Sequence, residues 1–139
     1  MDLQVVRETL KQDEGEVLHA YQDHLGYWTI GYGRLIDKRR GGGITQREAE
    51  FLLDSDISRV VDQLATRTDF LSHPEEVQHA LINMAFQLGV NGLMSFRKMW
   101  GHLDLREYEA AADEALNSRW AQQTPERAKR VTDMMRSGS

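Results

Sequence analysis

The stretch Asp13–Gly33, DEGEVLHAYQDHLGYWTIGYG, decides the fold, because its residue spacing changes from a helical to a strand period. Before it, apolar residues recur at intervals of three and four, which predicts a helix over residues 2–14. Gly15 suits the end of that helix, because glycine adopts a positive φ without strain. After it, period-two alternation predicts a small antiparallel sheet over residues 17–37.

Three residues of this stretch can form a reactive site. Glu14 ends the first helix, where the helix dipole disfavours the charged form of a carboxyl, and a carboxyl that keeps its proton suits a general acid. Asp23 opens the turn of the hairpin. If Trp28 and Ile30 face a core, Thr29 faces away from it. The three residues can then converge at the base of the hairpin, and two carboxyls beside a hydroxyl suit hydrolysis of a glycosidic bond.

Each of these residues also has an ordinary structural explanation. An Asp at the first position of a turn with Gly at the fourth is common turn chemistry, which accounts for Asp23. Thr29 alone is an unremarkable strand threonine, and Glu14 alone can be a solvated helix end. The spacing by itself therefore does not choose a reaction.

The same stretch resembles the catalytic segment of the phage-type lysozymes, the endolysins of the T-even phage family. That pattern is a Glu-Gly step, eight residues between the Glu and an Asp, and five more before a Thr within GYxTIGxG. Here it is formed by Glu14-Gly15, Asp23 and the segment 26–33. The likeness covers nearly the whole chain and continues at residues 44–50, 82–89, 118–120, 123–125 and 127–130.

The resemblance implies an α+β, mainly α fold with two lobes. A small antiparallel β-hairpin lobe is joined by a long helix to a helical lobe. We expect one lysozyme domain over residues 1–139, with a β-rich catalytic lobe at 13–44 and an inter-lobe helix at 45–66. The helical lobe then covers 67–139, and the helix 2–14 packs on it.

The resemblance also implies an activity and a set of site residues. The family hydrolyses the β-1,4 bond between N-acetylmuramic acid and N-acetylglucosamine in bacterial peptidoglycan, with inversion, and so lyses cell walls. The implied catalytic residues are Glu14, Asp23 and Thr29, and Arg127 orients Glu14. Arg130 is expected to pair with Asp13. Substrate contacts are implied for Leu35, Phe86, Gln87 and Arg119.

One position departs from the family pattern. After the Gly-Tyr-Gly of the second strand the family commonly has His, whereas this chain has Arg34. That His is structural in the family, so the exchange bears on local stability more than on chemistry.

The remaining sequence predicts mainly helices. Thr45-Gln46-Arg47-Glu48 is a capping box that starts a helix running to Thr66, about 30 Å at ~1.5 Å per residue. Pro74 starts an apolar, central helix that is expected to end at 89–92. Further helices are predicted at 94–103, 106–117 and from Thr124, as cap, to Arg136.

Composition limits the partners. The formal net charge of −5 and a pI near 5.5 argue against nucleic acid as a ligand. The chain has no cysteine, and His19 and His24 beside Asp23 lack metal-site spacing, so we expect neither metal nor cofactor. No apolar run reaches the ~20 residues of a membrane span, which predicts no membrane insertion.

The expected setting follows from the N-terminal stretch, which is polar from its second residue and predicts no signal peptide. We therefore expect a protein made in the host cytoplasm, and we expect it to be a monomer. It would reach the cell wall through a separate membrane-permeabilising protein.

Three other functions are compatible with parts of the sequence. A catalytically inactive wall-binding or phage-tail structural module could use the same fold, but all three candidate catalytic positions are intact. A lytic transglycosylase would need only the Glu, so Asp23 argues for hydrolysis. A plain helical interaction domain would not explain Glu14 at the unfavourable end of its helix.

Overall fold

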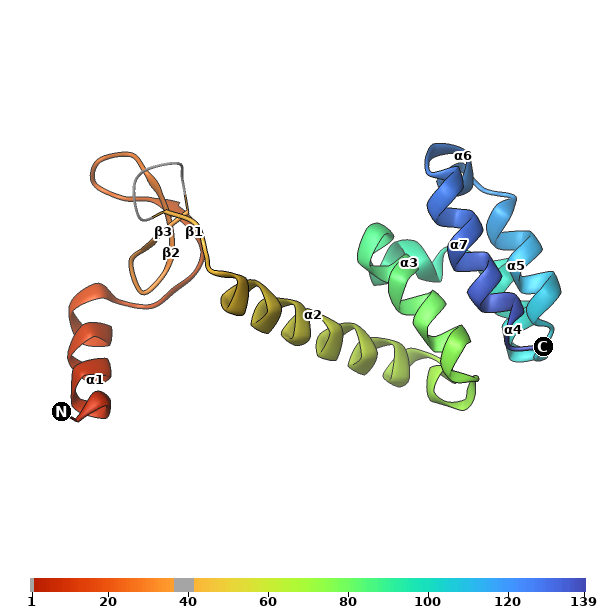
Figure 1. Ribbon diagram of the computed structural model, residues 1–139, viewed down its shortest axis with the longest axis horizontal. Coiled ribbons are helices and arrows are strands. Elements are labelled where there is room, and N and C mark those ends of the chain that lie inside the picture. Colours follow the sequence, from red (N-terminus) through yellow and green to blue (C-terminus); the bar gives the residue numbers. More distant parts are fainter. Residues whose placement is uncertain (1, 37–41) are drawn as a thin grey trace. The chain divides into compact units, whose positions relative to one another are not determined.

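The computed structural model describes residues 2–36 and 42–139 and divides the chain into two compact units, Met1–Leu52 and Leu53–Ser139. The boundary lies inside the long helix α2 (Gln46–Arg67). The α+β, mainly α class predicted from the sequence is confirmed, with one three-stranded antiparallel sheet among the described residues (Figure 1).

The first unit begins with a well-defined helix. The Asp2 side chain caps it by accepting a hydrogen bond from Gln4 N at 3.0 Å, and Gly15 ends it at a φ of 73°. The sheet that follows has the order β1-β2-β3, and the expected third strand is short. The elements are α1 (Leu3–Glu14), β1 (Val17–Gln22), β2 (Trp28–Gly31), β3 (Arg34–Leu35) and the first turns of α2.

The expected orientation of the central strand is wrong. Thr29 is only 2% exposed, whereas Trp28 is 49% exposed. The reason is the register, because Thr29 lies opposite Tyr21 on one side and Leu35 on the other. A residue of a central strand between two larger cross-strand neighbours is covered by them.

The predicted capping box at the start of α2 is confirmed. Thr45 Oγ1 accepts a hydrogen bond from Glu48 N at 3.1 Å, and Glu48 Oε1 accepts one from Thr45 N at 3.0 Å.

The second unit is helical and contains the apolar core. Helices α3 and α7 pack together, and α5 contacts both α4 and α7 (Figure 1). The core includes Leu64, Leu81, Met84, Leu103 and Met135, each fully buried. Its elements beyond α2 are η1 (Phe70–Ser72), α3 (Glu75–Met94), α4 (Arg97–Asp104), α5 (Tyr108–Leu116), α6 (Arg119–Gln123) and α7 (Pro125–Arg136).

Three details of this unit differ from expectation. Gly89 interrupts α3 as predicted, but the helix resumes and runs to Met94. The short helix α6 was not expected, and Ser118 caps it by accepting a hydrogen bond from Ala121 N. Thr124 precedes α7 but does not cap it with its side chain, and its hydroxyl donates to Trp120 O at 3.0 Å. No described helix is both long and apolar enough to cross a bilayer.

Two glycines give opposite predictions for stability. Gly89 has φ 77° and ψ 158°, a conformation that is essentially restricted to glycine. We expect Gly89→Ala to destabilise by about 1–3 kcal/mol. Gly101 lies inside α4 with open space around a built Cβ, so Gly101→Ala should stabilise by about 0.5–1 kcal/mol. Urea unfolding measures both, and equal effects of the two changes would contradict the assigned backbone.

A buried histidine, His73, makes the stability of the second unit depend on pH. It is 4% exposed, and its Nδ1 lies 3.0 Å from the Tyr108 hydroxyl. The Arg106 guanidinium lies against the ring, with Nη1 3.0 Å from Nδ1. Burial first and the Arg106 cation second lower the pKa of His73 below 6.5, while Asp104 and Asp69 oppose that shift.

Because the folded protein holds His73 neutral, the unfolded chain binds the proton first as the pH falls. Stability from this group is therefore complete above about pH 6.5 and decreases below it. Urea unfolding between pH 7.5 and pH 5 should show this loss, and His73→Gln should reduce it. The control is His79→Gln, whose side chain is 48% exposed beside Glu75. An unchanged pH slope in His73→Gln would contradict the assignment.

Candidate active site

The carboxylate of Glu14 lies against the backbone of the turn between β2 and β3. A Cβ built on Gly33 would stand 2.6 Å from Glu14 Oε2 and 3.2 Å from Cδ. Gly33 also has a φ of 76°, which side chains rarely adopt. The last residue of α1 therefore lies against a position whose backbone conformation favours glycine.

The same turn is held by its tyrosine. The Tyr32 hydroxyl donates a 2.6 Å hydrogen bond to Glu16 Oε2, and Lys11 Nζ lies 5.7 Å from the centre of the Tyr32 ring. The hydrogen bond to Glu16 is the main cause that raises the pKa of Tyr32 above 10.0, with burial and the charges of Glu16 and Glu8 adding to it. The turn is thus fastened to residues on both sides of Glu14 in the chain.

Asp23 organises the other end of the hairpin. Its Oδ1 accepts hydrogen bonds from Leu25 N and Tyr27 N, both at 2.9 Å. Its backbone N donates to Tyr27 O at 2.8 Å. These bonds fix the direction of the carboxylate.

Thr29 uses its hydroxyl proton locally. Oγ1 donates to Tyr27 O at 3.1 Å, so toward any further partner the same oxygen can act only as a hydrogen-bond acceptor. Tyr27 also bonds Asp23, and the two predicted residues therefore share one backbone neighbour. Leu35 lies directly opposite Thr29 in β3.

In the second unit, Arg127 is held by Asn83. Arg127 Nε donates to Asn83 Oδ1 at 2.9 Å, and Nη2 donates to Asn83 O at 3.2 Å. Two of its three nitrogens are thus anchored on α3, which fixes the plane of the guanidinium. Arg127 and Phe86 line one groove of about 560 Å³, together with Ile57 and Met134.

Gln87 is exposed rather than buried in the apolar helix. Its Oε1 accepts a 2.8 Å hydrogen bond from Trp120 Nε1, and its Nε2 lies 3.4 Å from Thr124 Oγ1. Trp120 is 4% exposed and packs edge-on against Phe96. Gln87 therefore serves the packing of Trp120, and its predicted contact with substrate stays a prediction.

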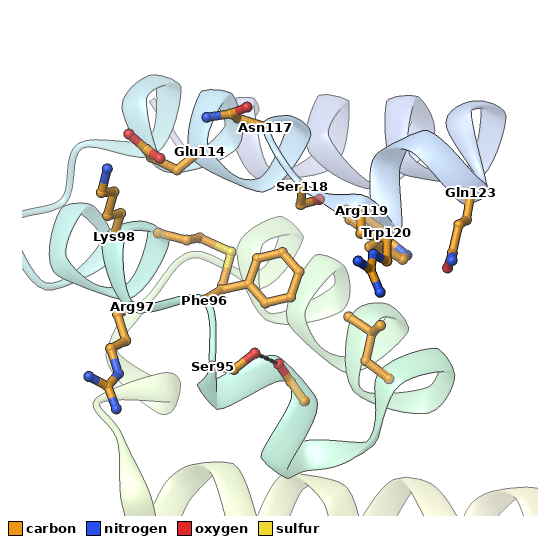
Figure 2. Close-up of a pocket in the computed structure, with 13 residues that line it drawn as sticks. Ser95, Phe96, Arg97, Lys98, Glu114, Asn117, Ser118, Arg119, Trp120 and Gln123 are labelled. Atoms are coloured by element: carbon orange, nitrogen blue, oxygen red, sulfur yellow. Dashed lines mark hydrogen bonds between the residues drawn. The ribbon is translucent and has the colours of Figure 1, made fainter.

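Arg119 borders a second hollow in this unit, of about 480 Å³ (Figure 2). Phe96 and Trp120 form its apolar wall, and Arg97 and Lys98 add two more cations to its lining. Glu114 is the acidic residue among them. The hollow combines an aromatic surface with positive charge, which suits a ligand that carries carboxylates.

The predicted residues divide between the units. Glu14, Asp23, Thr29 and Leu35 belong to the first, and Phe86, Gln87, Arg119 and Arg127 to the second. Sequence reasoning did not single out Gly33, although a Gly-x-Gly at a strand end is a detectable sign of close backbone approach. Among the described residues, no three His, Cys, Asp or Glu gather where they could hold a metal ion.

Comparison with known proteins identifies the family. The phage lysozyme family model matches residues 11–136. The chain is 30% identical to probable T4-type lysozyme 1 of Dictyostelium discoideum, over 96% of this chain and 95% of that protein. It is 32% identical to the pre-baseplate central spike protein Gp5 of Enterobacteria phage T4, over 95% of this chain and 28% of that protein. An endolysin of Salmonella phage P22 is 31% identical, over 75% of this chain and 73% of that protein.

The chain therefore belongs to the phage lysozyme family, which confirms the resemblance seen in the sequence.

The contact between Glu14 and Gly33 can be tested without an activity assay. Gly33→Ala places a methyl group where Glu14 Oε2 lies, so the carboxylate at the end of its flexible side chain must move. Carboxyl-carbon NMR should then show a shifted Glu14 resonance. Gly31→Ala is the matched control, because its φ is 69° but its Cβ would meet nothing within 4 Å. An unmoved Glu14 resonance in Gly33→Ala would refute the contact.

Proposed function

We propose that this protein is a muramidase that cleaves the β-1,4 bond between N-acetylmuramic acid and N-acetylglucosamine in bacterial peptidoglycan. The observation that carries the proposal is Glu14, an acid at a helix end resting on Gly33 of the hairpin that also holds Asp23 and Thr29. The family membership and the endolysin and lysozyme names of its relatives support it.

In this proposal the two carboxyls have different roles. Glu14 protonates the glycosidic oxygen as the bond to carbon 1 breaks. A water attacks carbon 1 from the opposite face and gives its proton to Asp23, while Thr29 Oγ1 accepts the second water hydrogen bond. Inversion requires carboxyl groups about 6.5–9.5 Å apart, which leaves room for that water.

The second unit would bind the substrate and orient Glu14. We propose that Arg127, whose plane is fixed by Asn83, orients Glu14, and that Leu35, Phe86, Gln87 and Arg119 contact the substrate. The cations around the hollow beside Arg119 suit the carboxylates of peptidoglycan stem peptides. The protein would act as a monomer, after release to the wall by a separate membrane-permeabilising protein.

The alternative is a catalytically inactive module of a larger wall-penetrating assembly. One relative is named a spike protein, and this chain covers only 28% of it. Clearing of a peptidoglycan suspension separates the two functions, because an inactive module would bind without clearing. Mass analysis of the products separates hydrolysis, which adds water, from transglycosylation, which leaves an anhydro-sugar.

Two substrates distinguish the roles of the carboxyls. A dinitrophenyl β-glycoside of the same glycan needs no proton donor, because its leaving group is a stable anion. Glu14→Gln should lose about 10²–10⁴-fold on peptidoglycan and keep most of its rate on the activated glycoside. Asp23→Asn should lose rate on both substrates. Circular dichroism should show both variants folded. Equal losses by Glu14→Gln on the two substrates would contradict its role as the acid.

The stereochemical outcome is read by NMR of the first product, before mutarotation. A β-linked substrate should release an α reducing end. A β product would mean retention, with Asp23 as a nucleophile at about 5–5.5 Å from the acid.

A further inference from the structure

The residue that follows Gly33 ties the turn to the start of α2. Arg34 Nε donates to Gly43 O at 2.7 Å, and Nη2 donates to the same oxygen. Arg34 Nη1 lies 3.1 Å from Glu48 Oε2. One guanidinium thus joins β3, Gly43 and the first turn of α2. This set of contacts needs the planar fork of arginine.

The acceptor of this ion pair is itself fixed. Glu48 Oε1 belongs to the capping box with Thr45, so Oε2 is the oxygen that meets Arg34. The hydrogen bonds from Thr45 first, and the charge of Arg34 as a further cause, hold the pKa of Glu48 below 4.5. The carboxylate therefore stays charged and oriented near neutral pH.

The backbone strengthens the same connection. Gly43 N donates to Leu35 O at 3.0 Å, and Gly43 has a φ of 86°. Both polar groups of the Gly43 backbone are therefore bonded to neighbouring residues of β3, the N–H to Leu35 and the carbonyl to Arg34. This bonding fixes β3 at the residue adjacent to Gly33.

The turn is consequently held at both ends. Tyr32 is bonded to Glu16 on one side, and Arg34 is bonded to Gly43 and Glu48 on the other. Gly33 lies between Tyr32 and Arg34, and its backbone contacts the Glu14 carboxylate. A shift of a few tenths of an ångström in Gly33 would change where Glu14 lies.

We propose that Arg34 is a positioning residue for the general acid. Its bonds to Gly43 and Glu48 set the position of the Gly33 backbone, against which the Glu14 carboxylate lies. This inference rests on the proposed function. Arg34 does not touch the reacting atoms in this account, and it acts only through the backbone of the turn. Its effect should therefore appear only where the reaction needs a well-placed acid.

The two substrates described above provide that test. Arg34→Gln should lower kcat on peptidoglycan about tenfold, with KM and the rate on the dinitrophenyl glycoside nearly unchanged. Arg34→Lys keeps the charge but cannot reach Gly43 and Glu48 together, so it should restore only part of the rate. Arg47→Gln is the control, because Arg47 lines the same hollow as Arg34 and Glu48 and its substitution removes the same charge. It should leave the rate on peptidoglycan nearly unchanged.

A second variant covers the case in which Arg34→Gln fails to fold. Glu48→Gln keeps the capping box, because Gln serves at that position, but removes the ion pair. It should show the same loss confined to peptidoglycan, at nearly unchanged melting temperature.

Three results would overturn the inference. The first is no loss in Arg34→Gln or Glu48→Gln, and the second is an equal loss on both substrates, which marks a merely structural role. The third is full rescue by Arg34→Lys, which marks an effect of charge. Glu14→Gln separates a failure of this inference from a failure of the proposed function. If Glu14→Gln loses rate only on peptidoglycan while Arg34→Gln matches the wild type, the proposed function stands and only the role of Arg34 is refuted. A wild type inactive on both substrates overturns both.

Discussion

The contact of the Glu14 carboxylate with the backbone of Gly33 is the constraint on which the placement of the candidate acid depends. It requires glycine at position 33, a positive φ there, and an end of α1 that delivers Glu14 to the turn. Gly15 supplies that end, and the bonds of Tyr32 and Arg34 keep the turn in place. Glu14 Oε2 therefore lies beside the turn although the Glu14 side chain is exposed.

The two units are stabilised by different forces. The second has an apolar core in which each fully buried aliphatic side chain contributes about 1.5–3 kcal/mol. In the first unit, Thr29 is the only buried residue among those that the structure describes. The order of that unit comes from hydrogen bonds, helix caps and glycine turns. Net contributions of such bonds are near 1 kcal/mol each. The unit that carries Glu14, Asp23 and Thr29 is therefore stabilised by many weak interactions, and a single substitution can remove any one of them.

Local chemistry was predictable from the sequence, and tertiary partners were not. Helix ends at Gly15 and Thr45 follow from caps and glycine conformation, which depend on a few neighbouring residues. The burial of Thr29 depends on cross-strand register, and the diversion of the Thr124 hydroxyl depends on Trp120. Of the candidate site, Glu14, Asp23 and Thr29 could be named from spacing and resemblance. The contact of Gly33 with Glu14 and the bonds of Arg34 needed coordinates, and the pairing of Arg127 with Glu14 stays a prediction.

A double-mutant cycle on hydrolysis of peptidoglycan tests the central claim, that Gly33 acts on the reaction through Glu14. The variants are Glu14→Gln, Gly33→Ala and the two combined, measured with a labelled peptidoglycan sensitive enough for slow enzymes. If Gly33 acts only by placing the acid, Gly33→Ala should lower the rate of the wild type and leave the rate of Glu14→Gln almost unchanged. Additive losses, with Gly33→Ala slowing both backgrounds equally, would contradict the account.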